Sequence, residues 1–521
     1  MTGRASAQTL TTLTSFDGID GANPYAGLVA DANGNLLGTT YLGGTANDGV
    51  VFEIGKASGG YASAPTTLVN FNGTNGSEPA GTPITLMADA NGNLFGTTSN
   101  YGEPAGTVFE IVKTSSGYAS TPTTLISFNE TDGANPFAGL IVDANGDLFG
   151  TTYQGGTDNI GTVFEIVKTS SGYASTPTTL VNFNGTNGAN PYAGLVADAN
   201  GNLFGTTYWG GTFQSGTVFE IPKTASGYAS TPTILVNFNG TNGLNPQGAL
   251  IADANGNLFG TTYLGGASGY GTVFEIVKTS SGYASTPTTL ITFNGTNGSE
   301  PTGTLIADAN GNLFGTTFEG GPAADGTVFE IVKTSSGYAS TPTTLANFNG
   351  ANGANPVAGL IADTNGNLFG TTYRGGASNF GTVFELSGSG FVATTPFASF
   401  QAGLAITTKQ PYSYALVAGF TTSAANTAIN PATEPVTVGI ANYTLTISAG
   451  AFQPIWGAYV YQGTINGVAT YALLTPLGGN RYAFAVAGSP ENLSTTTNPV
   501  TVSLTIGANG STSQINAAQV P

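Results

Sequence analysis

The feature that most constrains this chain is a tandem repeat of about 55 residues. The phenylalanine of a recurring Val-Phe-Glu segment first stands at position 52. It recurs 57 residues later and then five more times at steps of 55 residues. Self-similarity at such a period indicates repeated supersecondary units that bury a shared core by stacking on their neighbours. The seven positions are Phe52, Phe109, Phe164, Phe219, Phe274, Phe329 and Phe384.

Each copy contains four short runs that are rich in β-branched and aromatic residues and are bounded by Gly, Asn or Pro. They read AGLIAD, NLFGTTY, GTVFEIV and TTLVNF. The Asn-Gly of the intervening DANGN accepts the positive φ that a tight hairpin turn requires. Four antiparallel strands in seven copies predict an all-β fold, a seven-bladed β-propeller over residues 10–390. A solenoid is the alternative, but β-helix and leucine-rich repeats are shorter than these copies.

The residues of each copy also resemble a known family. The segments NGANPYAGLVADANGNLFGTTY and GTVFEI resemble the GloVer tandem repeat of bacterial exported proteins, over residues ~10–390. This resemblance implies a secreted or cell-surface protein, often with a C-terminal sorting anchor, and implies no established activity. The final STSQINAAQVP departs from that pattern because it has neither an apolar span nor a basic tail. The AGLIAD–DANGN–NLFGTTY hairpin resembles that of NHL-type propellers, which implies that AGLIAD is the inner strand and TTLVNF the outer one.

Two segments compete for the outer strand of the seventh blade, Thr12–Phe16 and Ala393–Phe400. We favour the N-terminal segment, because it ties the two ends of the ring together and removes an open edge. The repeat stops near residue 390, and the spacing of strand-like runs over residues 391–521 predicts an immunoglobulin-like β-sandwich. Residues 1–9 contain Ala-Ser-Ala and are expected to be either the disordered remnant of a secretory leader or an ordinary disordered terminus.

Composition excludes several kinds of site. The chain contains no His and no Cys, which excludes His-ligated metals, His-based catalytic triads, thiolate nucleophiles and disulfides. A net charge of −18 with only 10 Lys plus Arg repels phosphate backbones, so nucleic acid is not an expected partner. No apolar run is long enough to predict a transmembrane helix. We expect no cofactor and no bound metal.

Two acidic residues recur in every copy. The Glu of VFEI lies between apolar neighbours, which favours a structural role as an acceptor from Thr or Tyr of GTTY over a functional ring of charge. The Lys three positions later is interpreted as a solvated surface charge. The Asp of DANGN gives an Asp-x-Asn-x-Asn pattern, but the Gly and Glu of a calcium loop are not in their places. We therefore predict that this Asp caps its own turn.

The stretch after GTTY is the part of each copy that varies. We expect this loop and the FNGTNGANP loop to emerge on the same face of the ring. Simple drift of loop tips is one explanation for the variation, and an asymmetric binding face on a symmetric ring is the other. Aromatic residues and Arg are enriched at recognition hot spots, which favours a binding face. The predicted binding residues are Trp209, Arg374, Phe213, Tyr270, Phe380, Glu319 and Gln154.

The sequence thus predicts an exported, non-catalytic recognition or surface-structural protein whose variable loops bind a glycan or a surface protein. One alternative is an extracellular carbohydrate-active hydrolase or lyase, which needs two carboxylates in one pocket. Its candidate carboxylates are Asp48, Asp158, Glu319 and Asp325. The other alternative is a self-assembling surface coat or adhesin. We find no catalytic motif, so an enzyme is the less favoured reading.

Overall fold

The computed structural model describes residues 8–78, 86–89, 91–99, 105–198 and 200–393, with the strands and short adjoining segments between 395 and 520. The regular elements in these residues are all β-strands, which confirms the prediction of an all-β fold. None of them is a helix that could cross a membrane. The chain divides into two compact units, residues 1–307 with 311–391 and residues 308–310 with 392–521. The expected leader remnant lies outside the described residues up to position 7.

In its described residues the first unit contains seven four-stranded antiparallel sheets, each hydrogen-bonded in the order inner, second, third and outer strand. The first six sheets are β2 (Val29–Ala30), β3 (Leu36–Thr40), β4 (Val50–Ile54) and β7 (Thr66–Asn70); β8 (Met87–Ala88), β9 (Leu94–Thr98), β10 (Thr107–Ile111) and β13 (Thr123–Ser127); β14 (Ile141–Val142), β15 (Leu148–Thr152), β16 (Thr162–Ile166) and β19 (Thr178–Asn182); β20 (Val196–Ala197), β21 (Leu203–Thr207), β22 (Thr217–Ile221) and β25 (Thr233–Asn237); β26 (Ile251–Ala252), β27 (Leu258–Thr262), β28 (Thr272–Ile276) and β31 (Thr288–Thr292); and β32 (Ile306–Ala307), β33 (Leu313–Thr317), β34 (Thr327–Ile331) and β37 (Thr343–Asn347).

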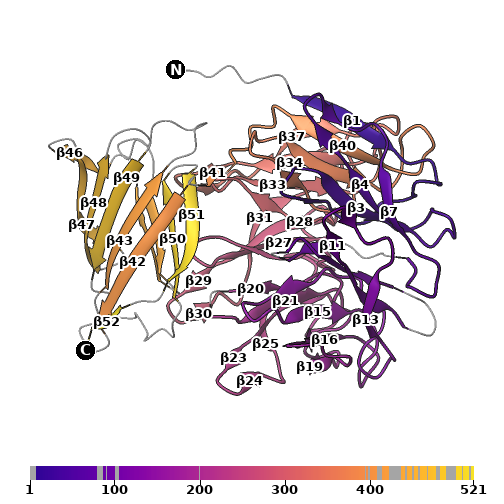
Figure 1. Cartoon of the computed structure of the whole chain (residues 1–521), viewed down its shortest axis with the longest axis horizontal. Coiled ribbons are helices and arrows are strands. Elements are labelled where there is room, and N and C mark those ends of the chain that lie inside the picture. The colour runs from indigo at the N-terminus through magenta and orange to yellow at the C-terminus, as the bar shows by residue number, and fades with distance from the viewer. Residues whose placement is uncertain are drawn as a thin grey trace. The chain divides into compact units, whose positions relative to one another are not determined.

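The seventh sheet combines both ends of the first unit. It contains β38 (Ile361–Ala362), β39 (Leu368–Thr372), β40 (Thr382–Ser387) and the N-terminal β1 (Thr9–Ser15). Indigo β1 lies beside orange β40 in Figure 1, and Thr9 pairs with Ser387 at one end of this ladder. The N-terminal segment therefore supplies the fourth strand, as we favoured. The competing segment instead provides β41 (Thr395–Pro396) and the start of β42 (Ser399–Thr407), which pair within the second unit.

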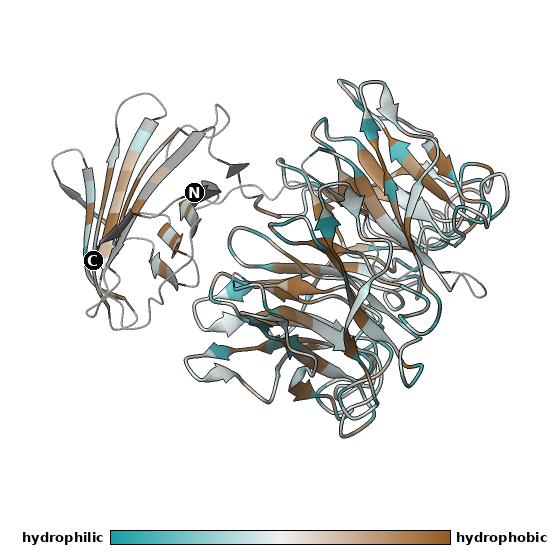
Figure 2. Ribbon diagram, turned by 60° about the horizontal axis from the view of Figure 1, so that its bottom comes forward, coloured by the Kyte–Doolittle hydropathy of each residue, from teal (hydrophilic) through white to brown (hydrophobic). Residues whose placement is uncertain are grey.

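The third strand of each sheet is buried on both faces. In the first sheet, Phe52 packs against Phe369 and Val383 of the seventh sheet, whereas Val51 packs against Phe109 of the second sheet. Five further clusters join the remaining neighbours in the same way. The stacking therefore returns from the last sheet to the first, and the sheets form a closed, propeller-like circle. Figure 2 shows the apolar residues concentrated along these strands, with hydrophilic residues at the loops.

The glycine of GTTY keeps space for this core. Gly205 pairs directly with Phe219 on the neighbouring strand. A Cβ at Gly205 would lie 2.6 Å from the Phe219 ring and 3.1 Å from Leu195. Any larger residue would displace the aromatic ring that fills the space between two sheets, because interiors of this density leave no room for an added methyl group.

The inner strands are shorter than the sequence pattern predicts, since only two residues of each AGLIAD segment pair. A cavity of about 270 Å³ is lined by residues in or just before the inner strands of five sheets, among them Ile141, Val196 and Ile361. Threonine hydroxyls link successive sheets next to this cavity. For example, Thr371 Oγ1 donates to the carbonyl of Ala26 at 2.9 Å. The AGLIAD segments are thus the inner strands, as the resemblance to NHL-type propellers implied.

Two-stranded hairpins follow the third strand in the first six sheets, and the tyrosine of each packs on the preceding sheet. The Tyr283 ring lies 5.4 Å from that of Phe204 in the preceding sheet. The seventh copy has no such hairpin, and Phe391 lies 5.1 Å from the Phe314 ring in the equivalent place. The hairpins are β5 (Lys56–Ala57) with β6 (Gly60–Tyr61), β11 (Lys113–Thr114) with β12 (Gly117–Tyr118), β17 (Lys168–Thr169) with β18 (Gly172–Tyr173), β23 (Lys223–Thr224) with β24 (Gly227–Tyr228), β29 (Lys278–Thr279) with β30 (Gly282–Tyr283), and β35 (Lys333–Thr334) with β36 (Gly337–Tyr338).

The second unit consists of two sheets that share one core, which includes Leu416 and Phe484 from one sheet and Val438 and Leu504 from the other. In the residues of this unit that the structure describes, the sheets have five and seven strands, together more than the seven to nine of an immunoglobulin domain. The immunoglobulin-like topology therefore stays a prediction. The five-stranded sheet has the order β41, β51 (Asn509–Ile515), β50 (Val500–Ile506), β44 (Val436–Ile440) and β45 (Tyr443–Ile447); the other has the order β46 (Gln453–Ile455), β47 (Ala458–Ile465), β48 (Val468–Pro476), β49 (Arg481–Gly488), β43 (Tyr414–Thr421), β42 and β52 (Ala518–Val520).

Replacing Phe16 by Ala tests how much the ring depends on its N-terminal closure. Phe16 follows β1, is fully buried, and its ring centre lies 5.0 Å from that of Phe52. Loss of a buried phenylalanine costs about 3–5 kcal/mol, so Phe16→Ala should lower the free energy of unfolding in urea by about that amount. Thr9→Ala, at the exposed start of the same strand, is the control and should change it by less than about 0.5 kcal/mol. An equally small effect of Phe16→Ala would show that the ring is stable without this closure.

Candidate functional site

Two kinds of loop emerge on one face of the ring, which we call the rim face. The first rim loop precedes the inner strand (residues 17–23 in the first sheet), and the second joins the second and third strands (residues 41–49). They are held together by their backbones, because Ala22 N donates to Leu42 O at 2.8 Å and Leu42 N donates to Ala22 O at 3.0 Å. Five more such bridges occur at Ala134/Gln154, Ala189/Trp209, Leu244/Leu264, Ser299/Glu319 and Ala354/Arg374.

The residue after GTTY therefore has a fixed backbone and a variable side chain, and we call this place the display position. Its carbonyl also accepts from a buried threonine, as Thr207 Oγ1 does to Trp209 O at 2.8 Å. The loop tips share a conformation too, since Asn47, Asn159 and Gln214 all have φ between 55° and 62°. The second rim loops of six sheets thus have similar backbones and differ in their side chains. The corresponding loop of the second sheet falls largely outside the described residues.

Four of the predicted binding residues are exposed aromatics. Trp209 is 42% exposed, Phe213 56%, Tyr270 46% and Phe380 40%. In the described part of the first unit these are all the large aromatic side chains that are exposed to this degree, and every one lies in a second rim loop. The fold does not require them for its core, because the loops that carry them are held by backbone bridges.

The other predicted residues differ in how they are held. Arg374 is exposed, and its guanidinium lies 5.5 Å from the centre of the Tyr373 ring. Glu319 is exposed at the display position of the sixth sheet. Gln154 is half-buried, and its Oε1 accepts from Asn135 Nδ2 at 2.6 Å. The Gln154 side chain therefore holds the rim loops together, a role that its place in the variable stretch did not predict.

A row of aromatic rings runs along the rim face over the third and fourth sheets. The ring centres of Phe137 and Tyr153 are 5.1 Å apart, those of Tyr153 and Tyr192 are 5.7 Å apart, and those of Tyr192 and Tyr208 are 6.0 Å apart. Trp209 ends the row in an edge-to-face contact with Tyr208 at 4.9 Å. Such geometry is favourable for aromatic pairs and holds the indole in place.

The aromatic row ends at a group of five side chains from the fourth, fifth and sixth sheets, which we call the polar cluster: Tyr208, Gln247, Tyr263, Glu300 and Glu319. Tyr208 lies beside Gln247, and the Tyr263 hydroxyl lies beside the Glu300 carboxylate. Burial raises the pKa of Glu300, the neighbouring Tyr263 hydroxyl lowers it, and the charge of Glu319 raises it again. Burial and the charge of Glu300 also raise the pKa of Tyr263, which keeps its hydroxyl protonated.

The sequence predictions missed Gln247, Tyr263 and Glu300, although departures from the repeat mark two of them. The fifth copy reads Asn-Pro-Gln where the first, third and fourth copies have an aromatic residue, and the second and sixth copies read Ser-Glu-Pro where the other copies have Asn before Pro. In the fifth copy Asn245 Nδ2 donates to the carbonyl of Tyr208 at 2.8 Å. A glutamate has no amide hydrogen to donate, so Glu300 cannot make the equivalent bond to the carbonyl of Tyr263.

Among the four carboxylates proposed for an enzyme, Glu319 has Glu300 as an acidic neighbour on the rim. Asp48 also has one, because the backbone N–H of Glu78 donates to the Asp48 carbonyl at 2.8 Å. The described contacts give no acidic neighbour for Asp158 or Asp325. Two predicted acids, Glu319 and Asp48, thus lie next to acids that the sequence did not single out.

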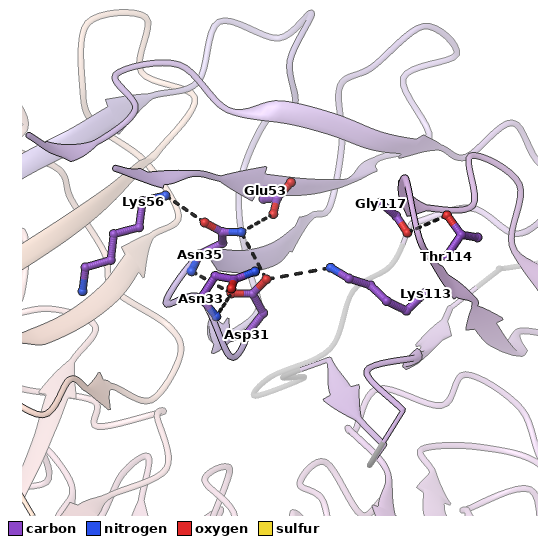
Figure 3. Close-up of polar contacts among 8 residues, drawn as sticks. All are labelled: Asp31, Asn33, Asn35, Glu53, Lys56, Lys113, Thr114 and Gly117. Carbon is purple, nitrogen blue, oxygen red and sulfur yellow. Dashed lines mark hydrogen bonds and ion pairs between the residues drawn. The ribbon is translucent and has the colours of Figure 1, made fainter. Parts of the chain in front are cut away.

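The DANGN turns lie on the opposite face, and the predicted capping by Asp is confirmed. Asp31 Oδ1 accepts from the backbone N–H of Asn33 and of Asn35, each at 2.9 Å (Figure 3). Asn35 Oδ1 in turn accepts from Lys56 N at 2.9 Å, which ties the turn to the next hairpin. In the part of the chain that the structure describes, no group of three or more acidic residues is placed to bind a metal ion.

The interpretations of the repeated Glu and Lys need correction. Asn35 Nδ2 donates to Glu53 Oε1 at 2.8 Å, so Glu53 takes its partner from the turn and not from Thr or Tyr of GTTY. Lys113 is more than a solvated charge, because its Nζ lies 3.7 Å from the centre of the Tyr118 ring and 3.8 Å from Asp31 of the preceding sheet (Figure 3 shows the ion pair). Both groups stabilise contacts between elements, and the long lysine stem makes the link between sheets.

A family model described as the Gloeobacter/Verrucomicrobia repeat matches residues 4–176, 66–252, 169–341 and 226–426, which confirms the resemblance found in the repeats. No curated protein sequence matches the chain.

Solved structures show distant likeness to the chain. A polysaccharide lyase described as a PL25 ulvan lyase is 12% identical, with 71% of this chain and 94% of that chain covered at a TM-score of 0.47. A puromycin hydrolase is 14% identical, with 67% and 50% covered at a TM-score of 0.39. A glucose dehydrogenase is 12% identical, with 72% and 99% covered at a TM-score of 0.36. Likeness at this level assigns no activity to the chain.

The half-buried glutamates of VFEI predict a pH dependence of stability. Burial raises the pKa of each, neighbouring aspartates raise it further, and a lysine of the next sheet lowers it. Because the folded-state pKa lies above the unfolded value, this contribution is fully present below the unfolded pKa and is lost as pH rises through the folded pKa. The residues are Glu110, Glu165, Glu220, Glu275 and Glu385.

The melting temperature should therefore rise as the pH is lowered from 7 toward the range just above the ordinary glutamate pKa. Replacing the five glutamates by Gln should flatten this part of the profile in calorimetry. A variant with an unchanged profile would contradict the assignment. The single replacement Asp158→Asn, an exposed carboxylate in a rim loop, is the control for loss of charge.

A loop exchange tests whether the second rim loops share one backbone. Replacing residues 209–215 (WGGTFQS) by the first copy's LGGTAND should change the free energy of unfolding by less than about 0.5 kcal/mol. Gly210→Ala is the contrast, because φ is 84° there and a Cβ would lie 2.6 Å from the Gly188 carbonyl carbon. This replacement should cost about 1–3 kcal/mol in denaturant unfolding. A costly exchange would mean that the side chains help to hold the loop.

Proposed function

The chain belongs to the Gloeobacter/Verrucomicrobia repeat family, and we propose that residues 10–390 form a seven-bladed β-propeller whose rim face binds a glycan without catalysis. Residues 391–521 would form a separate β-sandwich domain. We also propose a secreted or cell-surface location, which the resemblance of the repeats to exported proteins supports.

One observation carries this proposal. The large aromatic side chains exposed in the described part of the first unit all lie in second rim loops. An aromatic ring that is exposed to water keeps apolar area hydrated, which is unfavourable in free energy. These rings do not stabilise the fold by packing in the core. A pyranose ring presents a face of C–H groups that packs on an aromatic ring, while its hydroxyls hydrogen-bond to polar neighbours. The Trp209 indole and the adjoining polar cluster offer both kinds of contact.

The arrangement of the rim favours an extended chain of sugars over a single sugar. Half-buried Tyr153, Tyr192 and Tyr208 and exposed Trp209 span two neighbouring sheets, with buried Phe137 beside them. The side chains at the display positions differ from sheet to sheet, so the rim face is asymmetric although the backbone of the ring is symmetric. Specificity then comes from side chains that differ between rigid and equivalent backbone sites, where little conformational entropy is lost on binding.

A glycoside hydrolase is the second candidate, and the pair Glu300 and Glu319 favours it. Enzymes of this class use two carboxyl groups, one of which is kept protonated by a raised pKa. The pKa of Glu300 is raised by its burial. Release of new reducing ends by the wild-type protein, and its loss in Glu300→Gln, would favour this function over binding alone.

The variant Trp209→Ala with Arg374→Ala tests the proposed binding face. A glycan that the wild-type protein selects on an array should bind this variant at least about tenfold more weakly, because two hot-spot side chains are lost. The melting temperature should not change, since both side chains are exposed. Val277→Ala, an exposed apolar position outside the rim loops, is the matched control and should bind normally. Unchanged binding by the double variant would exclude this face.

A further inference from the structure

The first copy of the repeat differs from the others inside its core. Its second strand begins Leu-Leu-Gly, whereas each of the six other copies has Phe at the position of Leu37. In those copies the Phe ring packs against a Tyr or Phe ring of the following sheet, with ring centres 5.1–5.6 Å apart. Where the first sheet meets the second, Tyr118 packs in a cluster with the smaller Leu37. Leu37 therefore contributes no ring to this junction between sheets.

The lysine at the same junction also lies in a different place. In the first, third, fourth, fifth and sixth sheets, the lysine Cδ lies over the Gly of its own DANGN turn, 2.7–2.9 Å from where a Cβ would stand. At Gly92 the nearest lysine atom is Lys113 Cγ, at 3.6 Å. The Lys113 ammonium group lies 3.7 Å from the centre of the Tyr118 ring, compared with 4.9–5.6 Å for the lysines of the other hairpins. The end of the Lys113 side chain thus covers the tyrosine and leaves its own turn uncovered.

A cavity of about 320 Å³ lies at this junction. Its apolar lining includes Leu37 and Leu94, which are each 1% exposed, and Tyr118 also lines it. Exposed Asn33 and Asn91 belong to the lining as well, so the cavity opens at the DANGN turns. A mainly apolar pocket of this size with a few polar groups is typical of a small-molecule site. Even a cavity of about 150 Å³ can hold a benzene molecule.

The charged groups around the cavity favour a cation. Asp31 and Asp89 both line it, and Lys113 is the one basic residue of the described lining. Lys113 extends to Asp31 of the first sheet at 3.8 Å (Figure 3), whereas Asp89 is in neither of the two ion pairs of the described residues. A ligand ammonium group can therefore form a charge-assisted hydrogen bond with Asp89. A ligand carboxylate would meet two aspartates and one lysine that is already paired.

We propose that this cavity binds a small aromatic amine. The ligand ring lies against Leu37 and Tyr118, where the other junctions have the ring of a phenylalanine, and the ammonium group pairs with Asp89. A contact between the ligand ring and the Tyr118 ring is favourable in the same way as the contacts at the other junctions. The site lies on the face opposite the rim and is independent of the proposed glycan binding.

The test measures binding of phenethylamine to the full chain by calorimetry at neutral pH, where the amine is protonated. Phenethylamine should bind with a Kd of about 1 mM or lower, which is an ordinary affinity for a ligand of its size. 3-Phenylpropionate has the same ring and chain length with the opposite charge, and it should bind at least about fivefold more weakly. Butylamine carries the charge without the ring and should bind at least about tenfold more weakly.

Variants of the cavity locate the ligand. Leu37→Phe gives the first copy the residue of the other six. It should fill the cavity, raise the melting temperature and weaken binding of phenethylamine at least about tenfold. Ala88→Val narrows the same cavity with the residue that the third copy has at Val142. It should weaken binding several-fold, and it keeps the test valid if Leu37→Phe does not fold.

A change of charge tests the place of the ammonium group. Asp89→Asn should weaken binding of phenethylamine about three- to tenfold and should not weaken binding of 3-phenylpropionate. Asp363→Asn makes the same change in the equivalent turn of the seventh sheet. It is the matched control and should change the affinity less than about twofold.

Each of the other results would overturn the proposal. Unchanged binding of phenethylamine by both Leu37→Phe and Ala88→Val would place the ligand elsewhere. Tighter binding of 3-phenylpropionate than of phenethylamine would exclude an amine as the ligand. No binding of phenethylamine at about 10 mM, together with a raised melting temperature of Leu37→Phe, would show that the cavity is only a gap in packing.

Discussion

Burial of the Val-Phe-Glu strand between two neighbouring sheets is the interaction on which this structure depends. Phe52 packs on the sheet before it and Val51 on the sheet after it, so a sheet with one neighbour leaves an apolar face in water. Each sheet is therefore stable only with a neighbour on both sides, as in other repeat proteins. This requirement explains why residues from the start of the chain complete the last sheet, since β1 brings Phe16 into the core between the seventh and first sheets.

The same design separates stability from recognition. The core uses residues that recur from copy to copy, and the bridges of the rim loops use backbone atoms alone, so the side chains at the display positions contribute to neither. The display position is Leu42 in the first copy and Trp209 in the fourth. The side chain differs between them, but the backbone bridge to Ala22 or Ala189 is the same. Gln154 is the exception, because its bond to Asn135 makes it part of the loop. Variation is thus tolerated where the backbone alone fixes the loop.

Periodicity made most of the ring predictable from sequence. It predicts the four strands of each copy, whereas their order is what the resemblance to NHL-type propellers implies. The N-terminal closure follows from a different argument, because it ties the two ends of the ring together and removes an open edge. Periodicity overestimated the inner strands, since the narrow centre of the ring lets only residues such as Val29 and Ala30 pair. Periodicity could not predict the polar cluster, for a different reason. The contact between Tyr263 and Glu300 joins neighbouring sheets, and it depends on a Glu at a position where five of the seven copies have Asn. A repeat consensus averages such a difference away.

The distribution of charge over the ring follows from the repeat as well. A lysine recurs in the first six copies, and Lys113 and Lys223 form ion pairs with the recurring Asp of the preceding sheet, Asp31 and Asp143. Those lysines partly neutralise the acids of the DANGN face and help to join the sheets. The rim has no repeated cation, so each acid that appears there adds negative charge to that face. A ring built in this way acquires a negative rim from few substitutions, and Glu300 and Glu319 show how two of them come together across neighbouring loops.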